Sequence, residues 1–516
     1  MQNSAEDPYK RPLRLLEPPS DWLTMVSKLI ARDHIAVMVC GPKGAGKSTF
    51  CWMLANALLA SVPVQQRQSG FTQLSNNVAF LDLDPGQPEY SPPGEISLHK
   101  IRSFNLGPPF THPAYNGSNE LVRAHHFGHF SPKEDPHHYY RCAVDLFSHY
   151  KKRSVDKSSC PLIVNGSGWI QGSGLELLDN FIRDLDLTDV IYMSTTGPKE
   201  VVDILTEATF AAKVNLHQVT SHASELATRT AADMRMMQTL SYFHLDEPVG
   251  DNLRWNPSPM TSQPPVVARY AGPKSDIFAT MILGDGQSPD FLESILDGSI
   301  VGVVVIDEDL ALELSGTKFS STINNLRINA DLDYSISAGN AVFDDRDSTR
   351  STDTVQNEPT TEPPRLLRTP NDIPYLASLH HTTQPLRPAQ SRSLGQALIR
   401  GIDPNNKTFH LSTPIPNSII QNILKEGRQR IVLVRGNLDS PTWAYAEQFE
   451  FEKARRRRLE SSLDSKDDYE PDDVRVWAEK QPWASVVDGG RTGSGKVRRV
   501  RRDIRYKGQN GGLARE

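Results

Sequence analysis

The chain has 516 residues, which at about 150 residues per domain predicts roughly three domains, or two domains with unfolded arms. Hydrophobic residues make up 38% of it, and 56 Lys and Arg against 62 Asp and Glu give a formal net charge of −6. Nucleic-acid binding would therefore depend on local basic patches. The four cysteines show no CxxC spacing, which excludes a zinc ribbon and a disulfide scaffold. Without a long apolar run or a signal peptide, we expect a soluble intracellular protein without membrane contact.

The first part of the chain is predicted to form an α/β domain over residues 21–245, after a polar arm over 1–20. A helix is predicted over 21–31, with Asp21 as its N-cap. Its expected apolar face consists of Leu23, Val26, Leu29 and Ile30. Apolar runs predict buried strands at 34–40, 77–84, 161–165 and 189–194, and helices are predicted at 46–60 and 175–185. Such alternation is typical of a parallel sheet with helices on both faces.

The second part of the chain is predicted to form a smaller β-rich C-terminal domain over 246–336 and 373–450, because short apolar runs are broken there by turns. The insert over 337–372 contains too little apolar surface to fold and is predicted to be disordered. Residues 451–516 form a charged tail. Its basic runs at 455–458 and 498–502 are candidates for RNA contact or nuclear import, with solvated charge as the alternative.

Residues 41–48 fit the pattern G-x-x-x-x-G-K-[ST], between a predicted strand and a predicted helix, which indicates a P-loop NTPase fold. Its glycines let backbone N–H groups surround a phosphate, and the helix directs its positive end at the anion. Lys47 would reach the β- and γ-phosphates of ATP, and the Ser48 hydroxyl would ligate Mg²⁺. The predicted nucleotide-binding residues are Gly41, Pro42, Lys43, Gly44, Ala45, Gly46, Lys47, Ser48 and Thr49. A near-match at 490–497 has Val497 at the position of the metal-binding hydroxyl residue, and we interpret it as a flexible basic segment.

Asp82 and Asp84 close the second predicted strand, at the edge of the sheet where ligands bind. Because side chains alternate along a strand, we expect both carboxylates to face the same side, near Lys47. One carboxylate would hold Mg²⁺ through water, and the other would accept a proton from an attacking hydroxyl. The alternative is an ordinary turn, since Asp-Pro-Gly is common turn chemistry.

Two P-loop families carry a D-x-D-P segment at this place. In the partitioning and septum-site ATPases the signature lysine stands at the position of Pro42, whereas this chain has Lys43. The chain instead resembles the polynucleotide 5′-hydroxyl kinases, in particular their fungal nucleolar pre-rRNA-processing branch, which is related to the RNA kinase of the mRNA 3′-cleavage complex. The resemblance rests on GPKGAGKST, LDLDPGQPEYSPPGEISL, GPPFTHP, FGHFSPKEDPHHYY, PLIVNGSGWIQGSGLELL and MRMMQTLSYFH.

The resemblance implies an ATP- and Mg²⁺-dependent enzyme of the nucleus and nucleolus that phosphorylates 5′-hydroxyl ends of RNA. A pre-rRNA-processing endonuclease is the implied partner. The residues that it assigns are Lys47, Asp84 and Arg235 to catalysis, Ser48 and Asp82 to the metal, and Gln87 and Trp169 to the substrate. His129 is a further substrate-side candidate, favoured over a metal site because the nearby histidines form no tetrahedral set with cysteines.

Two of these assignments have structural alternatives. Trp169 would offer a stacking surface for a nucleobase, or it is a core residue in a turn. Arg235, with Arg229 as a second candidate, would neutralise charge on the transferred phosphoryl group, or it lies on a solvated helix face.

The chain departs from the family in two places. The family motif N-T-P-G-W reads N-G-S-G-W at residues 165–169. The phosphate loop begins at residue 41, so the family's β-rich N-terminal domain is expected to be lacking here, in either a shortened form of the protein or an incomplete gene model. Both departures favour a competing hypothesis, a catalytically weak nucleotide-binding scaffold of an RNA-processing complex.

Overall fold

The computed structural model describes most of the chain between residues 17 and 456. The described ranges are 17–32, 34–61, 77–112, 119–154, 160–222, 229–246, 253–285, 288–316, 365–377, 382–383, 385–441, 443–444, 446–449, 451–453 and 455–456. The predicted arm up to residue 16, the insert over 337–364 and the tail from 457, including the near-match at 490–497, lie outside them. No helix within the described ranges has the length and apolarity needed to cross a membrane.

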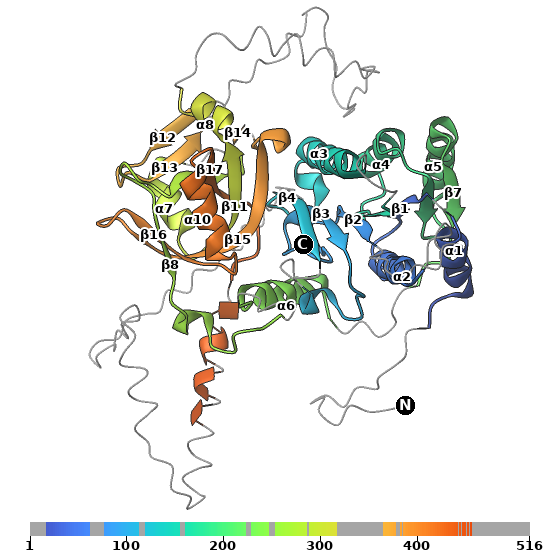
Figure 1. Ribbon diagram of the computed structural model, residues 1–516, viewed down its shortest axis with the longest axis horizontal. Helices are drawn as coiled ribbons and strands as arrows, with labels where there is room; N and C mark the ends of the chain where they lie inside the picture. The colour runs from blue at the N-terminus through green and yellow to red at the C-terminus, as the bar shows by residue number, and fades with distance from the viewer. Residues whose placement is uncertain are drawn as a thin grey trace, which may run out of the picture. The chain divides into compact units, whose positions relative to one another are not determined.

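A seven-stranded sheet with the order β4-β3-β2-β5-β1-β6-β7 forms the first domain (Figure 1). The strands are β1 Ala36–Cys40, β2 Val78–Asp82, β3 Glu95–Ile101, β4 Glu120–His126, β5 Leu162–Asn165, β6 Asp189–Tyr192 and β7 Asn215–Gln218. β2, β5, β1, β6 and β7 pair in parallel, which confirms the predicted parallel sheet. β3 and β4 extend it by antiparallel pairing. The sequence did not reveal β3 because the buried polar residues Glu95, Ser97 and His99 interrupt its apolar run.

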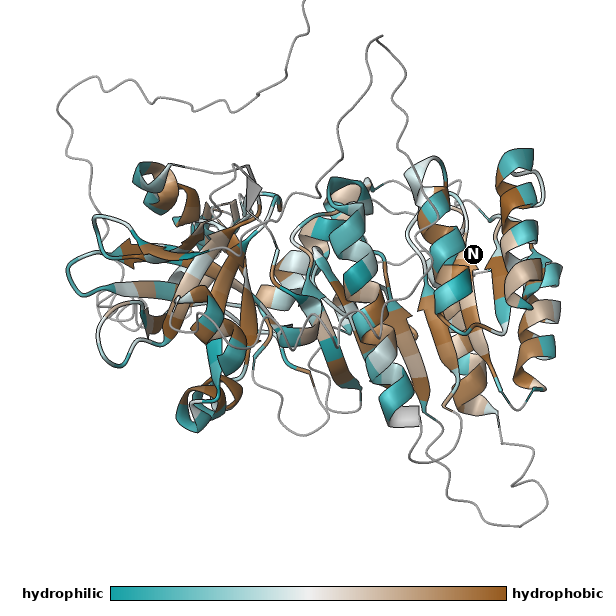
Figure 2. Cartoon of the chain, turned by 90° about the horizontal axis from the view of Figure 1, so that it is seen from above, coloured by the Kyte–Doolittle hydropathy of each residue, from teal (hydrophilic) through white to brown (hydrophobic). Residues whose placement is uncertain are grey.

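Helices cover both faces of this sheet, as predicted (Figure 1). The helices are α1 Ser20–Ile30, α2 Lys47–Ala60, α3 Pro136–Ser154, α4 Ser173–Asp184, α5 Lys199–Ala212 and α6 Ala231–Phe243. Alternate side chains of each strand enter opposite cores. Val37 and Val39 of β1 pack with α1 and α2, whereas Met38 between them packs with α3, α4 and α5. Figure 2 shows the resulting hydrophobic strands between helices whose outer faces are hydrophilic.

The start of α1 differs from the prediction. Pro19, not Asp21, occupies the N-cap position of this helix, and no side chain caps it. The Asp21 carboxylate instead accepts a hydrogen bond of 2.6 Å from the backbone N–H of Thr220, beyond β7. The buried face also differs, because Trp22 is fully buried whereas Leu23 is 50% exposed. Asp21 therefore ties α1 to the end of the sheet at which the phosphate loop lies.

The predicted β-rich C-terminal domain is built on an eight-stranded sheet with the order β12-β13-β9-β17-β11-β15-β16-β8. Its strands are β8 Val266–Arg269, β9 Ile277–Ile282, β11 Ile300–Asp307, β12 Arg365–Arg368, β13 Pro374–Ala377, β15 Ser391–Asp403, β16 Thr408–Ser412 and β17 Gln429–Arg435. Its helices include α7 Leu292–Leu296, α8 Glu308–Leu314 and α10 Asn417–Glu426. The predicted disordered insert extended too far, because β12 pairs with β13 and so gains backbone hydrogen bonds that its composition does not reveal.

The two sheets meet along β4 and β15, within one compact unit of the chain. Arg123 of β4 donates hydrogen bonds to the carbonyls of Pro388 (2.7 Å) and Ser391 (2.8 Å). The Ser393 hydroxyl of β15 donates to the buried Glu95 carboxylate of β3 at 2.7 Å. A buried polar group without its hydrogen-bond partner costs free energy, so these contacts favour this one arrangement of the two domains.

Candidate active site

The loop between β1 and α2 has the conformation of a phosphate-binding loop. Gly44 and Gly46 have φ angles of 79° and 95°, in the left-handed region that glycine adopts without a Cβ clash. The Pro42 carbonyl accepts hydrogen bonds from the Ala45 N–H at 3.2 Å and from Lys47 Nζ at 3.0 Å. Because α2 begins at Lys47, its free N–H groups and positive end face the loop. The local structure therefore suits a phosphate anion.

The phosphate loop rests on α1, through a residue that the sequence analysis did not single out. A Cβ on Gly46 would lie 2.6 Å from Cη2 of the fully buried Trp22. The Trp22 indole N–H donates to the Thr220 carbonyl at 2.7 Å, and the His222 N–H donates to the Ala45 carbonyl at 3.0 Å. Trp22 thus links the loop to the chain segment that follows β7. The only available sequence signal was an aromatic residue in the first turn of an amphipathic helix.

Asp82 and Asp84 lie in different environments. Strand β2 ends at Asp82, so the alternation expected for the two carboxylates does not extend to Asp84. Asp82 is fully buried, and its oxygens accept hydrogen bonds from the Glu89 N–H at 2.6 Å and from the Asn165 amide at 3.0 Å. Asp84 Oδ1 accepts from the N–H groups of Gly86 (3.0 Å) and Gln87 (3.3 Å). No described residue donates a hydrogen bond to Asp84 Oδ2, which is therefore available to a ligand.

The electrostatics connect Asp84 with Lys47. Burial lowers the pKa of Lys47, and the nearby Asp84 carboxylate opposes this shift. Burial likewise raises the pKa of Asp84, against the attraction of Lys47. Burial raises the pKa of Asp82 to about 8, although the hydrogen bond from Glu89 opposes it. A carboxylate whose pKa is raised binds a proton more strongly, so Asp84 is suited to accept one.

The residues present fit a magnesium ion. Mg²⁺ prefers oxygen ligands such as carboxylates and hydroxyls. Ser48 follows Lys47 in the first turn of α2, and its hydroxyl makes no hydrogen bond to another described residue. The Ser48 hydroxyl is thus free to bind an ion directly, whereas both oxygens of Asp82 already accept hydrogen bonds from the protein, so Asp82 would reach an ion through water.

The segment after β5 lies against the phosphate loop. The Gly166 N–H donates to the Val39 carbonyl at 3.0 Å, and a Cβ on Gly168 would lie 3.2 Å from the Lys43 Cα. A Cβ on Gly166 would lie 2.9 Å from the Val39 oxygen, so the threonine of the family motif would require a backbone shift here. The glycine that replaces the family's threonine at position 166 therefore leaves room for the backbone of β1.

Trp169 follows that segment and is half-buried. Its indole ring packs against the first turn of α4, where a Cβ on Gly174 would lie 2.8 Å from the ring. The Lys133 ammonium lies over the ring, 5.7 Å from its centroid. Trp169 is thus an aromatic surface beside the phosphate loop, with a cation over it.

The segment after β4 closes another side of the site. A Cβ on Gly86 would lie 2.7 Å from the Phe130 carbonyl oxygen, so the segments after β2 and β4 are in contact. His129 is half-buried between Phe127 and this contact, and burial lowers its pKa. Its Nδ1 is buried without a hydrogen-bond partner among the described residues. Gln87, His129 and Phe130 therefore lie close together, next to the Asp84 turn.

Helix α6 covers the segment after Asp84. The Gln238 amide donates to the carbonyls of Pro88 and Ser91, each at 2.7 Å. Arg235, one turn earlier, lies over the Phe130 ring at 4.3 Å and forms an ion pair with Asp439 at 3.4 Å. Arg229 is exposed and precedes the helix, whose capping box uses Thr230 and Asp233. The structure therefore brings Arg235, but not Arg229, onto the wall formed by Phe130.

Residues 41–245 match the family model described as mRNA cleavage and polyadenylation factor CLP1 P-loop. The match covers most of the P-loop domain described above, which is therefore similar to that family. Two similar proteins are named polynucleotide 5′-hydroxyl-kinase grc3. The relative from Aspergillus niger is 38% identical over 95% of this chain and 60% of its own length. The relative from Aspergillus oryzae is 40% identical over 90% of this chain and 55% of its own length.

These relatives confirm the resemblance that the motifs predicted, and they set its extent. The chain spans only 55–60% of the length of these two relatives. A solved structure of wild-type Clp1p in complex with Pcf11p aligns with 80% of this chain and 77% of that chain, at 12% identity and a TM-score of 0.48.

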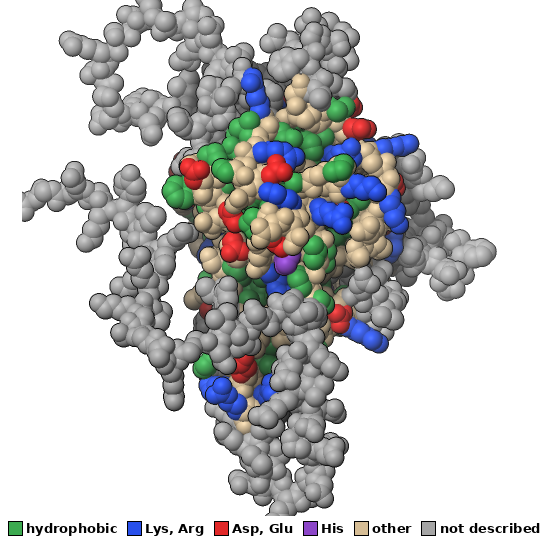
Figure 3. All heavy atoms as spheres, turned by 90° about the vertical axis from the view of Figure 1, so that its left-hand side faces the viewer, with side chains coloured by type: hydrophobic (Ala, Val, Ile, Leu, Met, Phe, Trp, Pro, Cys, Tyr) green, Lys and Arg blue, Asp and Glu red, His purple; other side chains and the backbone are tan. Residues whose placement is uncertain are grey.

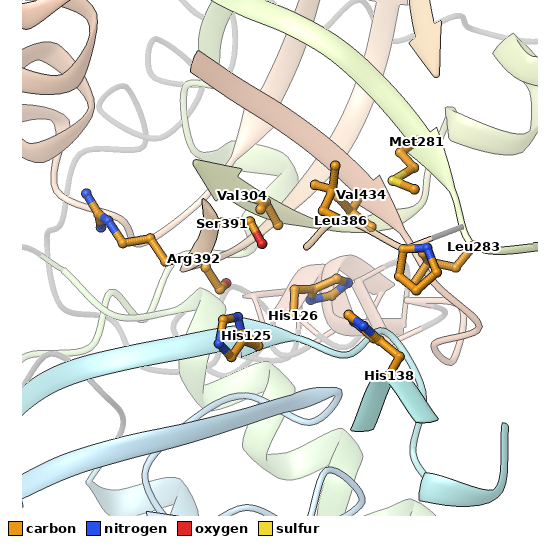
Figure 4. Close-up of a pocket in the computed structure, with 12 residues that line it drawn as sticks. His125, His126, His138, Met281, Leu283, Val304, Leu386, Ser391, Arg392 and Val434 are labelled. Atoms are coloured by element: carbon orange, nitrogen blue, oxygen red, sulfur yellow. The ribbon is translucent and has the colours of Figure 1, made fainter. Parts of the chain in front are cut away.

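Most of the remaining histidines of the CLP1-type domain have structural partners. His125 contacts Asp145 at 2.8 Å, and His112 contacts Glu89 at 2.9 Å. His125, His126 and His138 line one wall of a small cavity, opposite residues of the C-terminal sheet (Figure 4). Burial lowers the pKa of His126 and of His138 to about 3, so both rings are neutral near pH 7. Among the candidate histidines, His129 remains the one that lies beside the Asp84 turn.

Proposed function

We propose that the chain transfers the γ-phosphate of ATP to the 5′-hydroxyl end of RNA. The observation that carries this proposal is the Asp84 carboxylate, which interacts with Lys47 at the phosphate loop and keeps one oxygen free. The names of the grc3 relatives support the reaction type. A P-loop hydrolase needs a positioned water, whereas a kinase needs a base for a substrate hydroxyl, and the half-buried Asp84 carboxylate of raised pKa fits the base.

In this mechanism the phosphate loop holds the β-phosphate, and Lys47 leaves the Pro42 carbonyl to contact the γ-phosphate. Mg²⁺, when bound, would neutralise charge on the phosphate oxygens; the Ser48 hydroxyl would hold it, and Asp82 would reach it through a water. Asp84 accepts the proton of the attacking 5′-hydroxyl. Arg235 then stabilises the charge on the transferred phosphoryl group.

The RNA end would contact Trp169, Gln87 and His129. An indole surface binds any base by stacking, worth about 1–3 kcal/mol per base, so we expect little sequence preference. Figure 3 shows Lys and Arg interspersed with Asp and Glu on one face of the C-terminal domain, so that face has no uniform positive potential. The affinity for the RNA end would thus come from base stacking and from the phosphate site.

For the cellular role we propose pre-rRNA spacer processing in the nucleolus, as the resemblance implies. An endonuclease that leaves a 5′-hydroxyl end would act before this kinase and is the proposed partner. The grc3 names and the CLP1 family both support RNA processing as the setting.

The decisive experiment measures transfer of labelled γ-phosphate from Mg-ATP to a short 5′-hydroxyl RNA. We expect transfer to this RNA and none to the same RNA with a 5′-phosphate. Lys47→Ala is expected to lower the rate by at least 100-fold, because it removes charge stabilisation at the γ-phosphate. No transfer by a protein that binds ATP would favour the scaffold hypothesis, and full transfer by Lys47→Ala would show that the site lies elsewhere.

A further inference from the structure

The chain leaves the C-terminal sheet at the end of β17 and passes directly along the candidate active site. Residues 436–439, which we call the 436–439 segment, contact three separate parts of this site. No motif in the sequence marks this segment, because its role depends on contacts with residues 200 to 350 positions away.

The first contact is between backbones. The Asn437 N–H donates to the Gly128 carbonyl at 2.7 Å, and the Gly128 N–H donates to the Gly94 carbonyl at 2.9 Å. The Gly94 N–H in turn donates to the Pro85 carbonyl at 2.8 Å, next to Asp84. A Cβ on Gly436 would lie 2.0 Å from the Gly128 oxygen, so the backbones at Gly436 and Gly128 are in van der Waals contact. Three consecutive hydrogen bonds thus connect the 436–439 segment to the Asp84 turn.

The second contact is made by Leu438. Its Cδ2 would lie 2.6 Å from a Cβ on Gly94, which has a φ of 96°. Leu438 therefore covers the glycine that closes the turn after Asp84. A larger residue at Gly94 would separate the two segments.

The third contact is made by Asp439. Its carboxylate, 65% exposed, pairs with the Arg235 guanidinium, whose side chain is only 19% exposed. Arg235 also lies over the Phe130 ring, whose carbonyl touches Gly86. An exposed ion pair of this kind contributes little free energy, so a phosphate oxygen, which binds Arg more strongly, can replace the carboxylate.

We propose that the 436–439 segment positions the active site: Gly436 and Asn437 hold the Asp84 turn through Gly128, and Asp439 keeps Arg235 over Phe130 until a phosphoryl group replaces the carboxylate. The catalytic consequence of this inference rests on the proposed kinase function, whereas its structural consequence does not. The C-terminal domain is then required for transfer itself, since a displacement of about 1 Å at a reacting group lowers rates by up to 100-fold.

The structural part is tested by hydrogen–deuterium exchange on Gly436→Ala. The added methyl group meets the Gly128 carbonyl, so we expect faster exchange in peptides that cover residues 84–94 and 127–130. Gly401→Ala in β15 is the matched control, because a Cβ there meets nothing within 4 Å. Unchanged exchange in the folded Gly436→Ala protein would overturn the proposal, whether or not the wild type is a kinase.

The catalytic part is tested on the same proteins. We expect Gly436→Ala to lower kcat at least 10-fold while the Kd for ATP stays within about 2-fold, and Gly401→Ala to match the wild type. A wild-type kcat in Gly436→Ala would contradict the positioning role, whereas a wild type without transfer contradicts only the proposed function.

The role of Asp439 is tested by a double-mutant cycle with Arg235. We expect Asp439→Asn to lower kcat 2- to 5-fold in the wild-type background and to have no further effect in Arg235→Ala, because the two residues act as a pair. Equal losses in both backgrounds would overturn the proposed link between Asp439 and Arg235. Glu426→Gln, at an exposed carboxylate of α10, is the charge control.

Discussion

Asp82 and Asp84 are separated by one leucine but differ in chemistry, because their carboxylates have different hydrogen-bond partners. Asp82 is enclosed by hydrogen bonds from Glu89 and Asn165, so it fixes the position of the segments after β2 and β5. Asp84 is held through one oxygen by two backbone N–H groups, and its other oxygen is free. The same residue type therefore supports the site at one position and faces the ligand at the other.

We predict that Asp84→Asn lowers transfer to 5′-hydroxyl RNA by about 100- to 10,000-fold, the contribution of a general base. The amide keeps the oxygen that accepts the hydrogen bonds from Gly86 and Gln87, so the turn and ATP binding are retained. The measurement is single-turnover transfer together with the Kd for ATP. Asp203→Asn, at an exposed position of α5, is the control. Transfer by Asp84→Asn within 10-fold of the wild type would assign the base to another residue.

The motif residues could be predicted because phosphate chemistry needs particular residue types at fixed spacing. The phosphate loop, Asp84 and the neighbourhood of Trp169 follow from such local patterns. Trp22 and Phe130 could not be predicted, because each reaches the site through contacts that only the folded chain creates. The ion pair between Arg235 and Asp439 could not be predicted for the same reason.

At the scale of elements, apolar runs identified the strands that are buried on both faces. β3 was missed because its inward positions carry Glu95, Ser97 and His99, whose burial is supported by side-chain partners rather than by hydrophobicity. Element boundaries also depended on tertiary contacts, as the shift from Asp21 to Pro19 at the start of α1 shows. α1 nevertheless packs against the phosphate loop, because Trp22 lies under Gly46.

We predict that Trp22→Ala destabilises the protein by about 3–5 kcal/mol and raises the Kd for ATP, because the cavity lies directly under Gly46. Leu23→Ala, at the neighbouring and half-exposed position, is the matched control and is expected to behave like the wild type. Chemical denaturation and ATP titration measure the two effects. A destabilised Trp22→Ala protein with the wild-type Kd for ATP would mean that α1 contributes to the core but not to the loop.

At the scale of the whole molecule, the contact between the two sheets includes a buried carboxylate besides apolar side chains. Glu95, 2% exposed, accepts a hydrogen bond from Ser393 of β15, and His126 lies beside it at 3.9 Å. Burial raises the pKa of Glu95 from its usual value of 4.5 to about 8. Because burial lowers the pKa of His126 to about 3, no positive charge on that ring compensates a Glu95 carboxylate near pH 7. The interface is therefore most stable when Glu95 is protonated.

The sign of the pH dependence follows from this pKa. A group whose pKa is raised in the folded state stabilises the protein below its unfolded pKa, and this contribution is lost as the pH rises through the folded value. For Glu95 the loss occurs between about pH 4.5 and pH 8, at up to ~1.4 kcal/mol per pH unit, and it is complete above pH 8. Glu95→Gln has the shape of the protonated acid, keeps an acceptor for Ser393 and does not titrate.

We therefore predict that Glu95→Gln becomes more stable than the wild type between pH 5 and pH 8 and that the difference is constant above about pH 8. Measuring Tm of both proteins across this range tests it, and the contributions of the buried histidines cancel in the difference. Glu134→Gln, at an exposed position, is expected to show no such trend. A difference that does not change with pH, or that grows as the pH falls, would mean that Glu95 is ionised within the interface. The two domains would then be held together by a buried charge.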